Sequence, residues 1–228
     1  MNLGQAVQEV LRYADWGQGS SNAETMAKSY INQTRLDIAL KYDFPFLFAI
    51  ATATTTSSNV YNFPADFLDH LMIFMDDEDG NPIVIYEMTP GYWANHFRIP
   101  APIDISSDSP PYRAVIQGNY FRIVPDPPSG RTLTLWYYKK PDELTDDNQT
   151  DYFLSTYGET VVWGAAWRMA VYLDDEQKAA KFLPMYQEGI KAMILRENRK
   201  KADRRGMIRF KTWKDFDPAT LRRMFHVF

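Results

Sequence analysis

An acidic run at residues 76–81 is the first stretch of the sequence where side chains could do chemistry. It reads Asp-Asp-Glu-Asp-Gly-Asn, and carboxylates at this density around a glycine suggest a calcium-binding loop. If Gly80 took the sixth position of such a loop, Met75 would take the first and Tyr86 the twelfth, where oxygen ligands are required. Asp79-Gly80 is instead typical of a hairpin, so we interpret the run as a solvated turn without metal.

The other common catalytic signatures are missing from the sequence. The three histidines, His70, His96 and His226, are far apart in the chain, and none belongs to an H-E-x-x-H pair. There is no cysteine, no phosphate-binding glycine loop and no G-x-S-x-G motif. We therefore predict that the protein is not an enzyme and binds no cofactor or metal; a carboxylate-dependent enzyme is our third hypothesis.

The C-terminal segment 202–228 has the residue types of a docking arm. Basic residues alternate with large apolar ones, residues 207–213 alternate as a strand does, and Asp217-Pro218 predicts the start of a short final helix. The segment is too short to form its own core, so it must dock on its own body, on a partner protein or, as the weakest alternative, on nucleic acid. The residues that we assign to docking are Arg204, Arg205, Arg209, Phe210, Lys211, Trp213, Lys214, Phe216, Leu221, Arg222, Arg223, Phe225 and Phe228.

The charge of the chain is divided unevenly. The net charge is −4, but residues 191–228 hold 12 Lys and Arg against 4 Asp and Glu, whereas residues 1–190 hold 13 against 25. Such asymmetry predicts a terminal arm that meets an acidic partner or nucleic acid. The sequence has no apolar run of the ~18 residues that cross a bilayer and no signal peptide, so we expect a soluble, unexported chain that is made in the cytoplasm.

Four segments have helical periodicity. Apolar residues recur at three-to-four spacing in residues 3–14, 21–42, 157–173 and 176–201. Ser21 and Glu24 predict a capping box, and Pro184 predicts a kink or a restart in the last helix.

The third of these helices is apolar nearly all round, which predicts that it is buried nearly all round. We assign Trp163, Gly164 and Trp167 to packing, either within a central core or at a subunit interface, because glycine lets another backbone approach and the tryptophans share one helix face.

The middle of the chain predicts strands. Residues rich in Thr, Val, Ile, Tyr and Phe, with turn residues every ten or so positions, predict strands at residues 46–55, 71–75, 83–87, 112–117, 120–124 and 132–138. Gly118-Asn119 predicts a two-residue hairpin turn, Thr89-Pro90 predicts a short helix at 91–97, and the proline-rich stretch 100–111 predicts a loop.

These segments predict an α+β protein. Its architecture would be an antiparallel four-helix bundle interrupted by an inserted antiparallel β-domain, with an extended C-terminal arm. The bundle would comprise residues 1–43 and 151–201, the β-domain 44–150 and the arm 202–228.

The order of these pieces resembles the head-to-tail adaptor (connector) proteins of tailed bacteriophages. The pieces that carry the resemblance are Phe44-Pro45-Phe46-Leu47, Tyr61-Asn62-Phe63-Pro64-Ala65-Asp66-Phe67, residues 112–125, residues 137–141, and the alanine- and aromatic-rich helix that leads to Tyr186-Gln187-Glu188.

The resemblance implies a virion structural protein of the neck, at the head–tail junction. Such a protein forms a ring, usually of twelve copies, that docks beneath the portal protein through its C-terminal arm, carries the tail or nozzle protein and surrounds the channel for genomic double-stranded DNA; no membrane is involved. The alternative is a DNA-binding accessory protein that uses the basic C-terminal tail.

Overall fold

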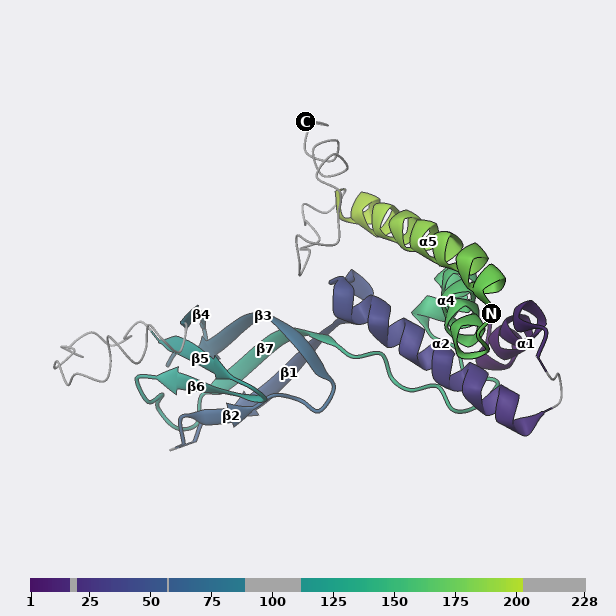
Figure 1. The fold of residues 1–228 in the computed structure, drawn as a ribbon. Helices are drawn as coiled ribbons and strands as arrows, with labels where there is room; N and C mark the ends of the chain where they lie inside the picture. Colours follow the sequence, from purple (N-terminus) through teal and green to yellow (C-terminus); the bar gives the residue numbers. More distant parts are fainter. Residues whose placement is uncertain (17–19, 57, 89–111, 203–228) are drawn as a thin grey trace. The chain divides into compact units, whose positions relative to one another are not determined.

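The computed structural model describes residues 1–16, 20–56, 58–88 and 112–202, without the side chains of residues 200–202. The chain divides into two compact units, one made of Met1–Leu47 and Lys140–Phe228 and the other of Phe48–Lys139. Within the described residues, the first unit contains the helices and the second contains the strands (Figure 1). In this part of the chain no helix is long and apolar enough to cross a membrane.

The described part of the helical unit consists of α-helices and one short 3-10 turn. These are α1 (Leu3–Ala14), α2 (Ser21–Lys41), η1 (Pro45–Leu47), α4 (Tyr152–Tyr172) and α5 (Glu176–Ala202).

Helix α1 begins with a capping box that the sequence analysis did not identify. The Asn2 side chain accepts a hydrogen bond from the backbone N–H of Gln5, and the Gln5 side chain accepts one from the backbone N–H of Asn2. The predicted capping box at Ser21 is wrong, because Ser20 is the N-cap of α2 and makes no capping hydrogen bond with its side chain.

Helix α4 lies in the middle of the helical unit. It packs against α1, α2 and α5, and its buried residues lie on every side of the helix. Asp151 caps its N-terminus by accepting a hydrogen bond from the backbone N–H of Leu154, so the helix begins earlier than the predicted residue 157. Tyr157 has non-helical dihedral angles (φ −129°, ψ 27°), which places a kink inside α4. Helix α5, in contrast, continues through Pro184 and does not restart there.

The β-unit is one seven-stranded sheet with the strand order β1-β7-β3-β4-β5-β6-β2. The strands are β1 (Phe48–Thr54), β2 (Val60–Asn62), β3 (Phe67–Asp76), β4 (Pro82–Met88), β5 (Arg113–Gln117), β6 (Tyr120–Val124) and β7 (Thr132–Lys139). The predicted hairpin at Gly118-Asn119 is confirmed, because Gln117 pairs with Tyr120 across it and Gly118 has the positive φ (62°) that such a turn requires.

One face of the sheet carries the core of this unit. The buried side chains alternate along the strands with more exposed ones, as a half-buried sheet requires. The core cluster consists of Phe63, Ile73, Met75, Ile85, Tyr112, Ala114, Phe121, Ile123, Leu133, Leu135 and Tyr137.

The predicted four-helix bundle with an inserted antiparallel β-domain is wrong. A helix that is apolar on all sides needs neighbours on all sides, so α4 lies between the other helices and does not take an equivalent place in a bundle. The sheet is also not purely antiparallel, because β4 and β5 pair in parallel, with Tyr86 opposite Arg113 and Met88 opposite Val115. A parallel pair needs a long crossover, and residues 89–112 supply it. The predicted short helix at 91–97 and the loop at 100–111 lie outside the described residues.

Candidate interaction surfaces and the contacts that position them

The predicted docking arm follows helix α5. All of the residues assigned to docking, from Arg204 to Phe228, lie outside the described residues. What the structure does describe is the helix that leads to the arm: α5 extends to Ala202, and Glu197 is buried one turn before that end.

Glu197 joins the end of α5 to the start of α4. Its side chain occupies the inward position that follows Ile190, Met193 and Ile194, and only 3% of the residue is exposed. The carboxylate accepts hydrogen bonds from the hydroxyl groups of Tyr152 (3.2 Å) and Tyr157. Burial, and then the hydrogen bond to Glu197, raise the pKa of Tyr157, so this hydroxyl keeps its proton and remains a donor.

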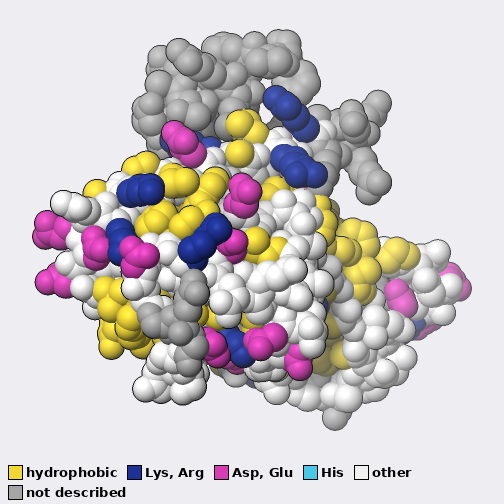
Figure 2. Space-filling model, turned by 90° about the vertical axis from the view of Figure 1, so that its right-hand side faces the viewer, with side chains coloured by type: hydrophobic (Ala, Val, Ile, Leu, Met, Phe, Trp, Pro, Cys, Tyr) yellow, Lys and Arg dark blue, Asp and Glu magenta, His cyan; other side chains and the backbone are white. Residues whose placement is uncertain are grey.

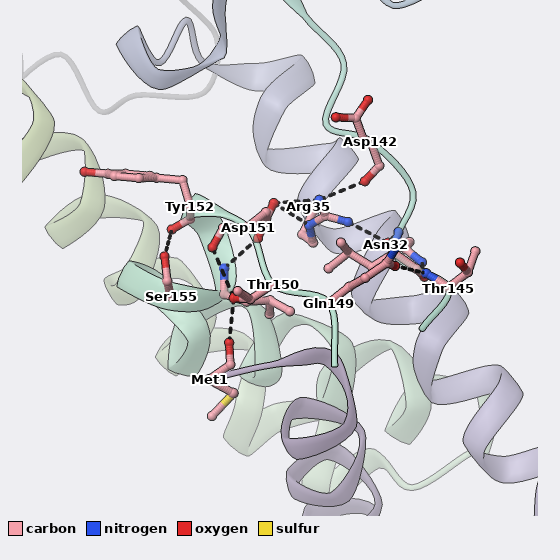
Figure 3. Close-up of polar contacts among 12 residues, drawn as sticks. Met1, Asn32, Arg35, Asp142, Thr145, Gln149, Thr150, Asp151, Tyr152 and Ser155 are labelled. Carbon is pink, nitrogen blue, oxygen red and sulfur yellow. Dashed lines mark hydrogen bonds and ion pairs between the residues drawn. The ribbon is translucent and has the colours of Figure 1, made fainter. Parts of the chain in front are cut away.

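A buried arginine holds the segment that returns to α4 (Figure 3). Arg35 of α2 is 1% exposed, and its Nε and Nη2 donate hydrogen bonds to Oδ2 of Asp151 at 3.0 and 2.6 Å. Its Nη1 donates to the side chain of Asn32 (2.6 Å), and its Nη2 also donates to the backbone carbonyl of Asp142 (2.9 Å). Asn32 in turn exchanges two hydrogen bonds with the backbone of Leu144. Two neighbouring turns of α2 therefore fix the course of the segment that leads into α4.

The N-terminus of the chain joins the same region. The hydroxyl of Thr150 donates a hydrogen bond to the backbone carbonyl of Met1 (2.8 Å), and the backbone N–H of Leu3 donates to the carbonyl of Gln149 (2.8 Å). Asp151 has a double role in this arrangement, because one oxygen accepts from Arg35 while the other caps α4. A carboxylate at a helix N-terminus also interacts favourably with the helix dipole.

Glycines bring α4 close to its neighbours. A Cβ at Gly164 would lie 2.5 Å from Cγ2 of Thr34 and 2.7 Å from the ring of Tyr186, and a Cβ at Gly189 would lie 2.6 Å from Oγ1 of Thr160. These distances are shorter than any carbon side chain allows, so α2 and α5 can approach α4 only where a glycine stands.

Two of the predicted packing residues leave part of their surface accessible. The Trp163 and Trp167 side chains are half-buried, and the Trp167 ring stacks on that of Tyr186 with centroids 6.3 Å apart. Gly164 is buried within the chain itself. The assignment of all three residues to a subunit interface stays a prediction, and the exposed parts of the tryptophans are what it would use.

A surface pocket of about 240 Å³ lies beside Trp167. Its walls come from α2 and α4, and they are formed by Tyr30, Trp167, Arg168, Val171 and Tyr172. Figure 2 shows a face of the molecule on which hydrophobic side chains are exposed between charged ones.

The outer face of the sheet carries a second apolar cluster. Trp136 of β7 lies between Ile50 of β1 and Met72 of β3 in the register of the sheet. Its ring meets the rings of Phe48 (5.6 Å between centroids) and Phe74 (4.9 Å) edge to face. Ile50 and Met72 are exposed, so this cluster faces outward from the sheet.

The acidic run forms the hairpin turn between β3 and β4. Asp77 accepts hydrogen bonds from the backbone N–H groups of Asp79 (2.9 Å) and Asn81 (2.7 Å), and these bonds hold the pKa of its carboxyl below the usual range. Glu78 pairs with Arg131 (2.6 Å). The described residues contain no cluster of three or more potential metal ligands, and the carboxylates of Asp77 and Glu78 have partners within the protein itself.

His70 is the one histidine within the described residues; His96 and His226 lie outside them. Its Nε2 is 3.1 Å from Glu87, and its Nδ1 is 3.6 Å from Asp69. These carboxylates, chiefly Asp69, raise the pKa of His70. Because His70 lies in β3 and Glu87 in β4, this contact links the two neighbouring strands.

The described residues thus contain polar contacts that position helices and two partly exposed apolar surfaces, one beside Trp167 and one around Trp136. In a comparison with known families, the model of the family described as SU10 adaptor protein matches residues 1–209. That match covers more than half of the chain, so the chain belongs to the SU10 adaptor protein family. The resemblance to phage adaptor proteins is confirmed. A comparison with curated proteins gave no match.

Proposed function

We propose that the protein is the structural head-to-tail adaptor of a tailed phage. It forms a ring of twelve copies that docks beneath the portal protein through the arm 202–228, and it carries the tail or nozzle protein around the channel for genomic DNA. The observation that carries this proposal is the adaptor-family match over residues 1–209. In this proposal the protein lies in the neck of the virion. Its three functional parts are the helices of residues 1–43 and 151–201, the strands of residues 44–150 and the arm.

Apolar side chains in the arm supply the anchoring energy in this proposal. Fully burying a large apolar side chain contributes about 1.5–3 kcal/mol, whereas an exposed ion pair contributes about 0–1 kcal/mol. The side chains that act as anchors are Phe210, Trp213, Phe216, Leu221, Phe225 and Phe228. The arginines of the arm set its register against acidic groups of the portal and speed the encounter.

A ring of arms binds far more tightly than a single arm. Ordering each residue of an arm costs about 1–2 kcal/mol of backbone entropy, which offsets much of what one copy gains from its contacts. Linking the copies in a ring makes each later contact intramolecular. The adaptor should therefore join the portal cooperatively.

A DNA-binding accessory protein is the second candidate, and the excess of 12 basic over 4 acidic residues in 191–228 favours it. Salt separates the two functions. Binding to phosphates weakens steeply as salt rises because counterions are released, whereas apolar docking changes little.

The experiment that tests the proposal mixes the full-length protein with purified portal rings and, separately, with duplex DNA. We expect a mass increase of the portal that corresponds to a ring of copies and that persists when the salt concentration is raised. Tight, strongly salt-dependent binding to free duplex without binding to the portal would contradict the adaptor function.

A further inference from the structure

The pocket beside Trp167 combines apolar walls with exposed apolar side chains at its rim. The lining includes the aromatic residues Tyr30, Trp167 and Tyr172, and Val171 and Tyr172 are 57% and 59% exposed. Large apolar side chains with this exposure, next to a concave surface, are a common feature of protein–protein contacts.

Arg168 lines the same pocket and has a side-chain nitrogen that is buried without an acceptor. Arg168 lies with its guanidinium 5.5 Å from the Trp167 ring centroid, and its Nη2 is 3.3 Å from Oδ2 of Asp37. Its Nε is buried and has no hydrogen-bond partner in the described part of the chain. A buried donor without an acceptor costs about 1–3 kcal/mol, so the contacts within the chain satisfy Arg168 only in part.

The charges around this arginine favour an anion. Asp37 also pairs with Lys41 (3.1 Å) and accepts a hydrogen bond from Tyr186 (3.1 Å) on the same oxygen. Two cations thus share one carboxylate, which leaves one positive charge in excess next to apolar walls. The group that fits is a carboxylate carried beside an apolar side chain.

The chain itself is a source of such groups. Residues 1–190 contain 25 acidic residues against 13 basic ones, so the body of a neighbouring copy presents many carboxylates. The arm fits less well than the body, because its basic residues outnumber its acidic ones and repel Arg168. Duplex DNA is a poor fit, since a phosphate backbone needs a row of cations and this pocket has aromatic walls around one arginine.

We propose that this pocket receives a carboxylate-bearing apolar segment of a second copy of the chain and is one half of the contact between neighbouring subunits. The contact is heterologous, because a pocket on one copy meets a different surface of the next, and heterologous contacts of this kind produce rings when the rotation closes. This proposal rests on the ring proposed above and names the surface that builds it.

Charge substitutions at the rim test the proposal. Val171 is exposed, so Val171→Glu should fold normally while placing a negative charge opposite the incoming carboxylate; we expect the contact between copies to weaken by about tenfold or more. Val171→Lys, which has a similar size and the opposite charge, should retain the contact. Leu195→Glu is the matched control, because Leu195 is 44% exposed on α5 of the same unit and does not line the pocket.

The number of copies that join each portal ring is measured for the three variants. Fewer copies with Val171→Glu alone supports the proposal. An unchanged number with Val171→Glu, or an equal loss with Val171→Glu and Val171→Lys, overturns it.

Cross-linking identifies the occupant independently of the portal. The chain contains no cysteine, so Val171→Cys provides a single thiol for a photoreactive maleimide. Isotopically heavy and light copies are mixed at high concentration, with and without portal rings, and cross-linked peptides are analysed by mass spectrometry. Mixed heavy–light peptides that contain an acidic segment support a second copy as the occupant, even if the portal does not bind. Cross-links confined to one chain, or to the portal, overturn it.

Discussion

The guanidinium of Arg35 and the carboxylate of Asp151 are joined by two hydrogen bonds, although the residues are 116 positions apart in the chain. The pair is the link between α2 and the N-terminus of α4, and each partner makes a further contact, since Arg35 holds the returning segment and Asp151 caps the helix. A buried arginine is tolerated here because three acceptor groups surround it.

Removing this arginine should destabilise the helical unit strongly. Arg35→Met leaves Asp151 without its cation and removes the hydrogen bonds that Arg35 donates to Asn32 and Asp142, so we expect the free energy of unfolding to fall by about 3–5 kcal/mol. Lys28→Met is the control, because Lys28 pairs with the exposed Asp147 of the same returning segment and its loss should cost no more than about 1 kcal/mol. Both values come from urea denaturation followed by circular dichroism, and equal costs for the two variants would contradict the role of Arg35.

Close packing at Gly164 gives a second prediction. Alanine has the higher helix propensity by about 1 kcal/mol, yet its Cβ at this position would collide with Thr34 and Tyr186, so Gly164→Ala should destabilise by about 1–3 kcal/mol. At Gly158 the nearest atoms belong to the flexible side chain of Met1, and Gly158→Ala should be neutral or stabilising. Thermal melts of Gly164→Ala and Gly158→Ala measure both effects. A higher melting temperature for Gly164→Ala would show that the helices have room to separate.

The sequence predicted most of the elements but not their arrangement. Period and turn residues locate α1, α2, α5 and the Gly118-Asn119 hairpin, because each of these depends on neighbouring residues. The parallel pairing of β4 with β5 joins strands that residues 89–112 separate in the sequence, and no local pattern predicts such a pairing. Strand β2, with three residues, is too short to produce a periodic signal.

The sequence also did not predict which polar residues are buried. Arg35 and Glu197 are charged residues within otherwise apolar helix faces, and sequence periodicity assigns such residues to the solvent. Their partners, Asp151 and Tyr157, come from distant parts of the chain, so no spacing rule could reveal the pairs. The orphan nitrogen of Arg168 was missed for the same reason. A charged residue at an inward position of a helical stripe is the one signal that could have indicated Glu197.

The hydroxyl of Tyr157 should matter more than that of Tyr152. Tyr157→Phe leaves the buried Glu197 with one fewer donor, which should cost about 1–3 kcal/mol in the free energy of unfolding. Tyr152 is partly exposed and its hydrogen bond is 3.2 Å long, so Tyr152→Phe should cost less. Denaturation of the two variants in parallel provides the comparison, and the reverse order would mean that Glu197 is held by Tyr152.

Stability should depend on pH through His70. Its pKa is raised above 6.5 in the folded state, so the folded protein binds the proton more tightly than the unfolded chain does. The contribution of His70 is therefore fully present below pH 6.5 and is lost as the pH rises through the folded pKa. We expect it to be below about 1 kcal/mol, because the pair is partly exposed. His70→Gln should remove this pH dependence from the unfolding free energy; a variant that kept it would assign the effect to another group.

Truncation after Lys201 tests the central claim most directly, namely that the arm attaches an adaptor ring to the portal. The truncated chain keeps α1, α2, α4, the whole sheet and all of α5 except its last residue, so its circular-dichroism spectrum should match that of the full-length protein. Both proteins are mixed with portal rings, and the mass of the complex is measured. We predict a ring of added copies with the full-length chain and no added mass with the truncated one. Binding that survives the truncation undiminished would contradict the account and place the anchor in the helices or the sheet.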